Sequence, residues 1–430
     1  MLKIMVKIIV GTLILLLLAC LALQMDDELD EDQISFMKLS ETPAQSDAYF
    51  YLLGLAVDKN KDPISEGKKL YEGIKLIENH NQRANYLDQK PIQLMLDKSI
   101  FPEDELLCSV GQSECMTVID NNLDRIPQLL SKNTLFIKRY QTFLHLDDYH
   151  TLTQPSVDEP FPPYEYLSMA TRIINLQQIW QASQGKQAQA INALYQSHEQ
   201  LRKLLTKQDM LIGKLIVLNL LSENIDAINL LAMTHNLTLS TPLLLLTKQD
   251  RSLVNSFSRD ARGGYQLYSK LDRAENIFSS NLSSPHIPSW VTRILYKPNM
   301  TTNQSNKWYL YFAMLSELPA NEFVQEVQLS DRIPAIKTHW IRNSIGTVLS
   351  QVSVPNYQEY IADFWDMDSK IQLFNAALNN NEISDIIDTT KSIYADQKNI
   401  APYLSEDKKQ LCFDSPIHSE PKYNCLKIKL

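Results

Sequence analysis

Apolar residues recur at intervals of three and four along much of the chain, which is the spacing of one face of an α-helix. Ser46 is suited to cap one such run, and Asp62-Pro63 is suited to open the next. Two further helices are predicted over residues 117–131 and 134–146. The chain contains only ten glycines in 430 residues, and this low proportion also favours helices.

Residues 164–235 carry three helical patterns in close succession. The first begins at Tyr164 and is expected to stop at Gly185, and the second has its apolar face over residues 191–205. The third, over residues 210–221, is apolar nearly all round and is predicted to be the central core helix. The short connections between the three predict stacked antiparallel helical hairpins. No fixed repeat period is found.

Near the C-terminus, residues 357–378 show a long apolar stripe that predicts an amphipathic helix. Asp363, Asp366 and Asp368 within it are expected on its charged outer face. The last twenty residues contain short apolar pieces that could pair as a small β-hairpin. The predicted fold class is therefore mainly α: an irregular domain of stacked antiparallel helices.

Four prolines interrupt the helical pattern between residues 154 and 163. This stretch makes the region 150–163 the best position for an internal domain boundary. One domain with a long loop explains the same pattern equally well, so both alternatives stay open.

The N-terminus has the pattern of a targeting element. Lys3 and Lys7 precede an apolar run over residues 8–23, and an acidic stretch follows directly. Residues 2–25 reach the length of about 20 residues that a membrane span needs. Because basic residues stay on the cytoplasmic side, the chain after the span is predicted to lie outside the cytoplasm.

Three regions follow from this topology. Residues 1–24 are expected to be a signal anchor that is retained as a transmembrane helix. Residues 25–44, which are acidic and lack a sustained periodicity, are expected to be a flexible tether. Residues 45–430 are then the extracytoplasmic helical domain.

Two processed forms of the N-terminus are alternatives to the retained anchor. The sequence Leu17-Leu18-Ala19-Cys20 resembles the cleavage box of bacterial lipoproteins, in which Cys20 would be lipidated and become the mature N-terminus. The apolar run continues after Cys20, which is unlike most lipoproteins. A conventional signal peptidase could instead cleave after Ala22, because small residues lie at the required spacing.

The other four cysteines form two close pairs, Cys108 with Cys115 and Cys412 with Cys425. Even numbers of cysteines at short spacing in an exported chain favour structural disulfides. A redox pair or a metal site is the alternative. Neither pair has the Cys-x-x-Cys spacing that is usual for redox or zinc chemistry, so disulfides are predicted.

The charge of the chain argues against nucleic-acid partners. It contains 41 basic and 50 acidic residues, which gives a formal net charge of −9. Binding to phosphates requires a concentrated basic surface, and the sequence has none.

Histidines give the most suggestive chemistry, but each has a simpler interpretation. His145 and His150 enclose two aspartates, yet positions five apart do not share a helix face, so a solvated helix end is favoured over a metal site. His198 lies on an apolar stripe and is interpreted as a satisfied core histidine. The sequence that follows His198 lacks the second histidine that a zinc-protease helix requires.

Other motifs are equally weak. The aspartates at 363, 366 and 368 lack the glycine and the final glutamate of a helix-loop-helix calcium site. Arg262-Gly263-Gly264-Tyr265 is too short for a phosphate-binding loop or a nucleophile elbow. We therefore predict no catalytic residues, no metal site and no cofactor, although residues distant in sequence can still meet in a site.

Several short motifs stand out along the exported region. They are Tyr49-Phe50-Tyr51-Leu52-Leu53-Gly54, Asp62-Pro63, the pair Cys108 and Cys115, Arg139-Tyr140, and Lys297-Pro298-Asn299. Together they resemble the motifs of a proteobacterial family of single-span, membrane-anchored extracytoplasmic proteins that has no established activity. The resemblance covers most of the exported region and implies a location in the bacterial envelope.

Two functional hypotheses follow. The first is a non-enzymatic protein that binds or organises an envelope protein partner at the periplasmic face of the inner membrane. It agrees with a tethered helical domain that has an acidic surface and lacks a recognisable chemical motif. The second is an extracytoplasmic hydrolase acting on cell-wall or peptide substrates, which would need a pocket with convergent carboxylates or histidines.

Overall fold

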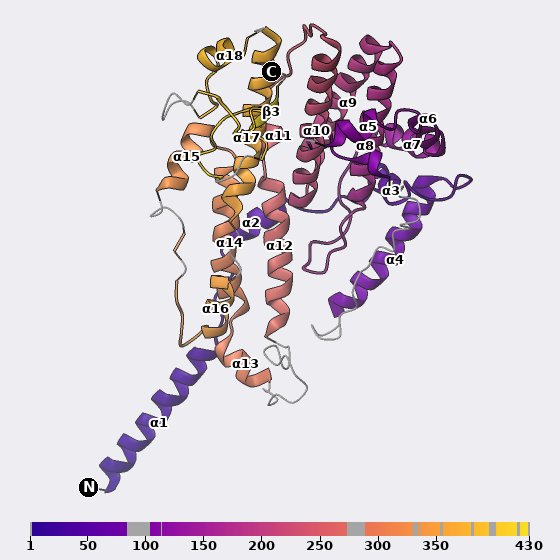
Figure 1. Ribbon diagram of the computed structural model, residues 1–430. Coiled ribbons are helices and arrows are strands. Elements are labelled where there is room, and N and C mark those ends of the chain that lie inside the picture. Colours follow the sequence, from indigo (N-terminus) through magenta and orange to yellow (C-terminus); the bar gives the residue numbers. More distant parts are fainter. Residues whose placement is uncertain are drawn as a thin grey trace.

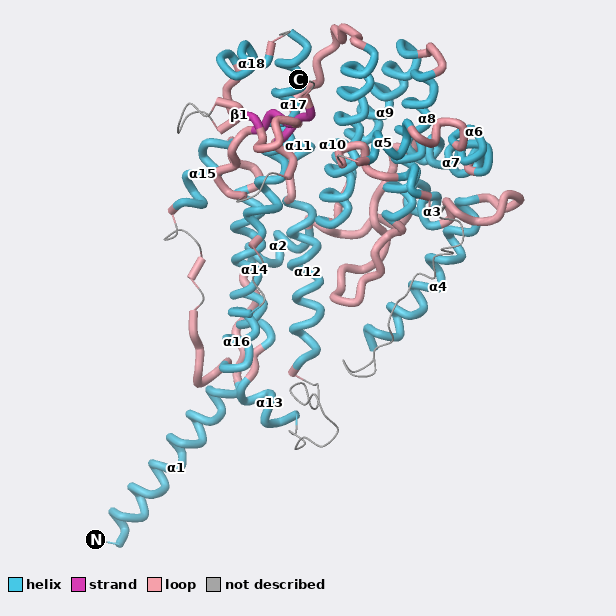
Figure 2. The backbone as a smooth tube through the Cα atoms, viewed as in Figure 1, coloured by secondary structure: helices cyan, strands magenta, loops and turns pink. Residues whose placement is uncertain are grey.

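The computed structural model describes residues 2–83, 104–112, 114–272, 289–329, 334–335, 337–352, 356–379, 382–394, 401–418 and 422–428. Over these residues the fold is mainly α, as predicted, with one small antiparallel sheet near the C-terminus (Figure 2). A continuous hydrophobic core extends from Phe36 to Leu426 and joins segments on both sides of the proline-rich stretch.

The first helix, α1 (Leu2–Gln24), extends away from the body of the molecule (Figure 1). Among the described residues, α1 and α10 (Leu211–His235) are long and apolar enough to cross a membrane. The most apolar part of α10 is 72% buried, which makes α10 a core helix, as predicted for residues 210–221. The corresponding part of α1 is not buried at all, so a membrane anchor and a signal sequence both fit it.

The acidic segment after α1 is not a flexible tether, and this prediction was wrong. It contains helix α2 (Glu31–Lys38), which buries Phe36 and Met37. The carboxylate of Asp26 accepts hydrogen bonds from the backbone N–H groups of Asn299 and Met300, at 2.8 and 3.2 Å. These N–H groups begin a helix and have no partner within it, so an acidic side chain stabilises them. Ordered structure thus continues directly from α1.

The next two helices begin at the positions that were predicted from their capping residues. In α3 (Asp47–Leu53) the Ser46 hydroxyl accepts a hydrogen bond from the N–H of Tyr49 at 3.0 Å. In α4 (Pro63–Arg83) the carboxylate of Asp62 accepts one from the N–H of Ser65 at 2.8 Å.

Helices α3 and α4 approach so closely that one glycine is required. A Cβ atom at Gly67 of α4 would lie 1.8 Å from the carbonyl oxygen of Phe50 in α3. The backbones of the two helices are in direct contact at this point, and only glycine fits there.

The helix predicted over residues 117–131 is two helices in the structure, α5 (Cys115–Asp120) and α6 (Ile126–Lys132). Pro127 lies in the first turn of α6, where its missing N–H is tolerated, and it could not have continued a helix from α5. The short η3 (Glu105–Leu107) precedes this pair, and α7 (Thr134–Leu144) follows it close to the predicted range.

Helices α8 (Tyr164–Ser183), α9 (Gln187–Lys207) and α10 pack against one another as neighbours, which confirms the predicted stack (Figure 1). Gly185, with a φ of +86°, occupies the left-handed region just after α8 and ends that helix.

The second half of the chain forms a layer in which α12 and α14 pack side by side (Figure 1). Its helices are α11 (Lys248–Arg251), α12 (Val254–Leu271), α13 (Ser289–Leu295), α14 (Pro298–Leu315), α15 (Ala320–Gln328), α16 (Ser344–Val352), α17 (Tyr357–Asn379) and α18 (Ile383–Thr389).

The predicted C-terminal hairpin is present and has a third strand. Strands β1 (Tyr403–Leu404), β2 (Gln410–Cys412) and β3 (Cys425–Lys427) pair antiparallel in this order. Cys412 lies opposite Cys425 in the register of β2 and β3, and a disulfide joins the two. A second disulfide joins Cys108 and Cys115, so both predicted pairs are confirmed. The side chain of Cys20 lies outside the described residues.

The proline-rich stretch is held to the core by buried charges. Arg259 of α12 is 3% exposed, forms an ion pair with Glu159 and donates to the carbonyl oxygen of Thr153. Burial raises the pKa of Glu159 to about 7, and the guanidinium of Arg259 opposes this shift. The stretch is therefore packed against the helices on both sides of it.

Candidate functional site

The two histidines of the predicted solvated helix end remain at the surface. His145 lies at the C-terminal end of α7, with Nδ1 2.6 Å from the Gln141 carbonyl oxygen and Nε2 3.0 Å from the Gln200 amide nitrogen. His150 is also exposed. Over the described part of the chain, no group of three or more His, Cys, Asp or Glu side chains is arranged to hold a metal ion.

His198 is a core histidine and is 1% exposed on α9. Among the described residues neither ring nitrogen meets strict hydrogen-bond geometry, but the side chain of Asn224 interacts with the ring and favours its charged form. Burial lowers the pKa of His198 to about 4, so its ring is neutral at pH 7.

The three aspartates of α17 are buried, so their predicted position on a charged outer face was wrong. Asp363, Asp366 and Asp368 are at most 1% exposed. The reason is that segments distant in sequence cover this face of α17 and bring partners for each carboxylate. Buried charges persist only when such partners are present.

These partners come from the C-terminal segment and from α11. Asp363 accepts a hydrogen bond from Lys422 at 2.6 Å and lies 3.1 Å from Nε2 of His418. The hydroxyl of Tyr394 donates to Asp366 at 3.0 Å. Burial raises the pKa of Asp366 to about 6, with His418 and Tyr394 opposing the shift.

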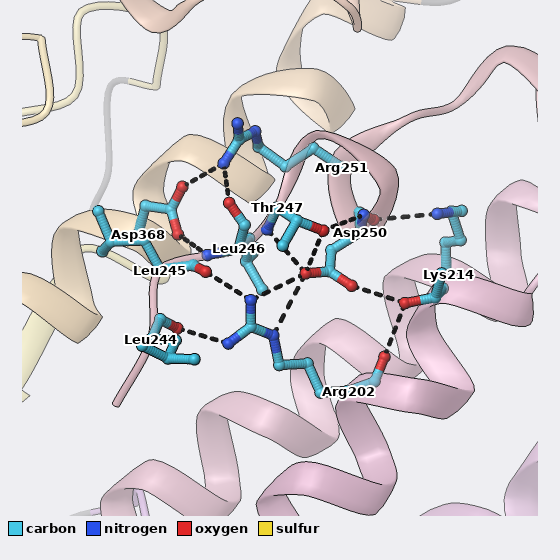
Figure 3. A network of polar contacts seen from close by, with 10 residues as sticks. Arg202, Lys214, Leu244, Leu245, Leu246, Thr247, Asp250, Arg251 and Asp368 are labelled. Atoms are coloured by element: carbon cyan, nitrogen blue, oxygen red, sulfur yellow. Dashed lines mark hydrogen bonds and ion pairs between the residues drawn. The ribbon is translucent and has the colours of Figure 1, made fainter. Parts of the chain in front are cut away.

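A second buried network holds the extended segment before α11, as Figure 3 shows. Arg202 of α9 donates to the carbonyl oxygens of Leu244 and Leu245 and to the carboxylate of Asp250. Arg251 in turn donates to Asp368 of α17 at 2.8 Å. Each of these charged groups is matched by a partner, so the network stabilises the packing of α9, α11 and α17 and leaves no group directed at a ligand.

Open space of ligand size lies instead between α10, the Cys108–Cys115 loop and the strands β2 and β3 that the second disulfide joins. We call this cavity of about 480 Å³ the disulfide pocket. Its volume falls in the range typical of ligand sites. It is lined by Gly111, Met116, Leu230, Met233, Thr234, Asp407, Lys409, Gln410, Lys427 and Ile428.

The walls of the disulfide pocket come from three parts of the chain that meet through Lys427. The ammonium group of Lys427 in β3 donates to the carbonyl oxygens of Val110 and Gln112, both at 3.0 Å, and so ties the sheet to the Cys108–Cys115 loop. Asn229 of α10 donates to the carbonyl oxygen of Lys427 at 2.7 Å. Burial lowers the pKa of Lys427, although Asp226 opposes this shift.

The chemistry of the disulfide pocket is that of a site for an apolar group. Met116, Leu230, Met233 and Ile428 line its interior. Methionine side chains adapt to irregular partners because they are unbranched and flexible. Lys409 and Asp407 are exposed and add one charge of each sign.

A larger and more open groove of about 920 Å³ runs along α9. Its lining is mostly polar and includes Asn192, Gln196, Gln200 and Lys203. The hydroxyl of Tyr195 donates to the carbonyl oxygen of Thr241 at 2.8 Å and closes one part of it. Its apolar lining residues, Ile191, Leu237 and Leu239, alternate with polar ones, so its lining is mixed in character.

The sequence predicted the two disulfides but did not indicate this site. The spacing of each cysteine pair revealed two stapled loops, whereas their proximity depends on contacts between residues more than 300 positions apart. Comparison of the chain with protein-family models, with curated proteins and with solved structures finds no match, so the family resemblance remains a hypothesis.

Proposed function

We propose that this protein is a membrane-tethered binding protein that holds a partner protein near the bilayer, on the periplasmic side of the bacterial inner membrane. The observation that supports it best is the disulfide pocket. The disulfide-closed Cys108–Cys115 loop, the disulfide-linked strands β2 and β3, and the core helix α10 form its walls, and Met116, Leu230, Met233 and Ile428 line its interior. A rigid cavity of this kind lowers the entropic cost of binding a protruding side chain of a partner.

The membrane and the compartment are inferred from the N-terminus and the cysteines. Lys3 and Lys7, which precede the apolar run over residues 8–23, favour a cytoplasmic N-terminus. Two disulfides favour an oxidising compartment for the domain. Lipidation at Cys20 would preserve the tether without a membrane span, whereas cleavage after Ala22 would release the domain. A mature N-terminus at Cys20, found by mass spectrometry, would replace the span with a lipid anchor.

Photo-crosslinking in intact cells tests the binding site. A photoreactive amino acid is placed at Thr234 or Lys409, both on the exposed side of the disulfide pocket. We expect a discrete crosslinked adduct, and we expect Met233→Glu to abolish it, because a charge in an apolar pocket repels an apolar group.

Met314, which is 62% exposed on α14, is the control position for the photoreactive residue. It should give no such adduct. The proposal fails if the pocket positions give no adduct, or if the adduct is unchanged by Met233→Glu while the variant remains folded by circular dichroism.

The contact between Asp363 and His418 is the observation that favours the alternative, a hydrolase. A carboxylate beside a histidine is a recurring catalytic arrangement. However, neither residue lines the disulfide pocket or the α9 groove. Hydrolysis of peptidoglycan or peptides by the purified chain, lost in Asp363→Asn, would favour the hydrolase over the binding protein.

A further inference from the structure

Two segments that contact the end of α1 expose large apolar side chains. Trp290 and Leu295 of α13 are 63% and 37% exposed. Trp340 and Ile341, in the turn before α16, are 57% and 74% exposed. We call these four residues the junction patch. Large exposed apolar side chains can mark an interaction surface.

The junction patch is held beside the end of α1 by specific contacts. Arg342 donates to the carbonyl oxygen of Met25 at 2.9 Å and to the carboxylate of Asp27 at 3.0 Å. Helix α13 contacts α1 directly. Figure 1 shows α13 next to the end of α1, on the side of the body from which α1 projects. The patch therefore lies at the level where the apolar helix ends.

The two segments that carry the junction patch differ in charge from the chain as a whole. Residues 289–297 and 337–343 contain no acidic residue, whereas the chain has a net charge of −9. Arg293 lies 4.0 Å from Asp272, and Lys337 is exposed. Tryptophan together with basic residues is typical of protein segments in the headgroup layer of a bilayer.

We propose that the junction patch inserts into the headgroup layer of the membrane that α1 spans, in the leaflet that faces the domain. This inference rests on the proposed role of α1 as a membrane span. The contacts of Arg342 with Met25 and Asp27, and of Asp26 with the start of α14, hold the end of α1 to the domain. Insertion of the patch then fixes the orientation of the domain, including the disulfide pocket, relative to the bilayer.

Quenching of tryptophan fluorescence by brominated lipid tests the insertion. The full chain is reconstituted into phosphatidylcholine vesicles whose acyl chains carry bromine close to the headgroup. The chain has five tryptophans, of which Trp290 and Trp340 belong to the patch. We expect the quenched fraction of the emission to fall at least twofold in the variant Trp290→Phe/Trp340→Phe. Trp180→Phe, at a half-buried site on α8, should leave the quenched fraction unreduced.

Flotation of the same vesicles separates this inference from the proposed function. If the chain floats with the vesicles and the double variant is quenched as strongly as the wild type, the insertion is wrong while the anchor stands. If the wild-type chain floats but is not quenched, the insertion is again wrong and the anchor stands. A chain that does not float overturns both the anchor and the insertion.

Discussion

Asp26 connects the segment that follows α1 to the helical domain. Its carboxylate accepts two backbone hydrogen bonds at the start of α14, so it acts as a cap supplied from almost 300 residues away in sequence. Caps of this kind satisfy N–H groups that the helix itself leaves without a partner.

The effect of removing this cap can be measured. We expect Asp26→Ala to lower the free energy of unfolding by about 1 kcal/mol, the usual cost of losing a helix cap. Urea denaturation of the full chain in detergent gives this value. Asp388→Ala, at an exposed position of α18, is the control and should change the value by less than about 0.5 kcal/mol. Equal effects of the two substitutions would argue against the capping role.

The buried carboxyl group of Asp366 predicts a dependence of stability on pH. Burial raises its pKa to about 6, so the folded chain holds this proton more tightly than the unfolded chain does. The resulting stabilisation is complete below about pH 4, near the unfolded pKa, and is lost as the pH rises through about 6. The pKa of His418 is also raised, mainly by its contact with Asp363, and its contribution likewise falls with rising pH.

Asp366→Asn removes the titrating carboxyl group at this position. Relative to the wild type, the variant should become more stable as the pH is raised from 4.5 to 7.5, as measured by the urea midpoint at each pH. An unchanged difference between the two proteins at both pH values would contradict the raised pKa.

At the scale of elements, the contact of α3 with α4 depends on a single glycine. A Cβ atom at Gly67 would overlap the Phe50 carbonyl oxygen, whereas a Cβ atom at Gly73 of the same helix would meet nothing within 4 Å. We expect Gly67→Ala to destabilise the chain by about 2 kcal/mol or more, because two backbones must separate. Gly73→Ala should stabilise it by about 0.5–1 kcal/mol through helix propensity. Thermal unfolding of the two variants compares them directly, and a stabilising Gly67→Ala would exclude the close approach.

At the scale of the whole molecule, the proposed location of the domain outside the cytoplasm can be checked through the cysteines. We expect Cys108, Cys115, Cys412 and Cys425 to be oxidised in the protein isolated from cells, as the structure pairs them. Non-reducing peptide mapping by mass spectrometry, with free thiols alkylated at lysis, measures this. Free thiols at all four positions would remove the argument for an oxidising compartment.

The sequence alone determined the features that depend on neighbouring residues. The helices of residues 164–235 follow from periodicity because each apolar face is formed by residues three and four positions apart. The starts of α3 and α4 follow from Ser46 and Asp62, which bond to N–H groups three residues later. The two disulfides follow from the short spacing within each cysteine pair.

Only the tertiary structure decided the positions of the acidic residues and the site. Asp26 and Asp363 were assigned to solvent because a pattern cannot show that Asn299 or Lys422 will meet them. The disulfide pocket combines residues near 111, 230 and 428, and the junction patch combines α13 with a turn 50 residues later. Burial of a carboxylate costs desolvation energy that a partner must offset. Its position is therefore set by contacts distant in sequence, which local patterns do not encode.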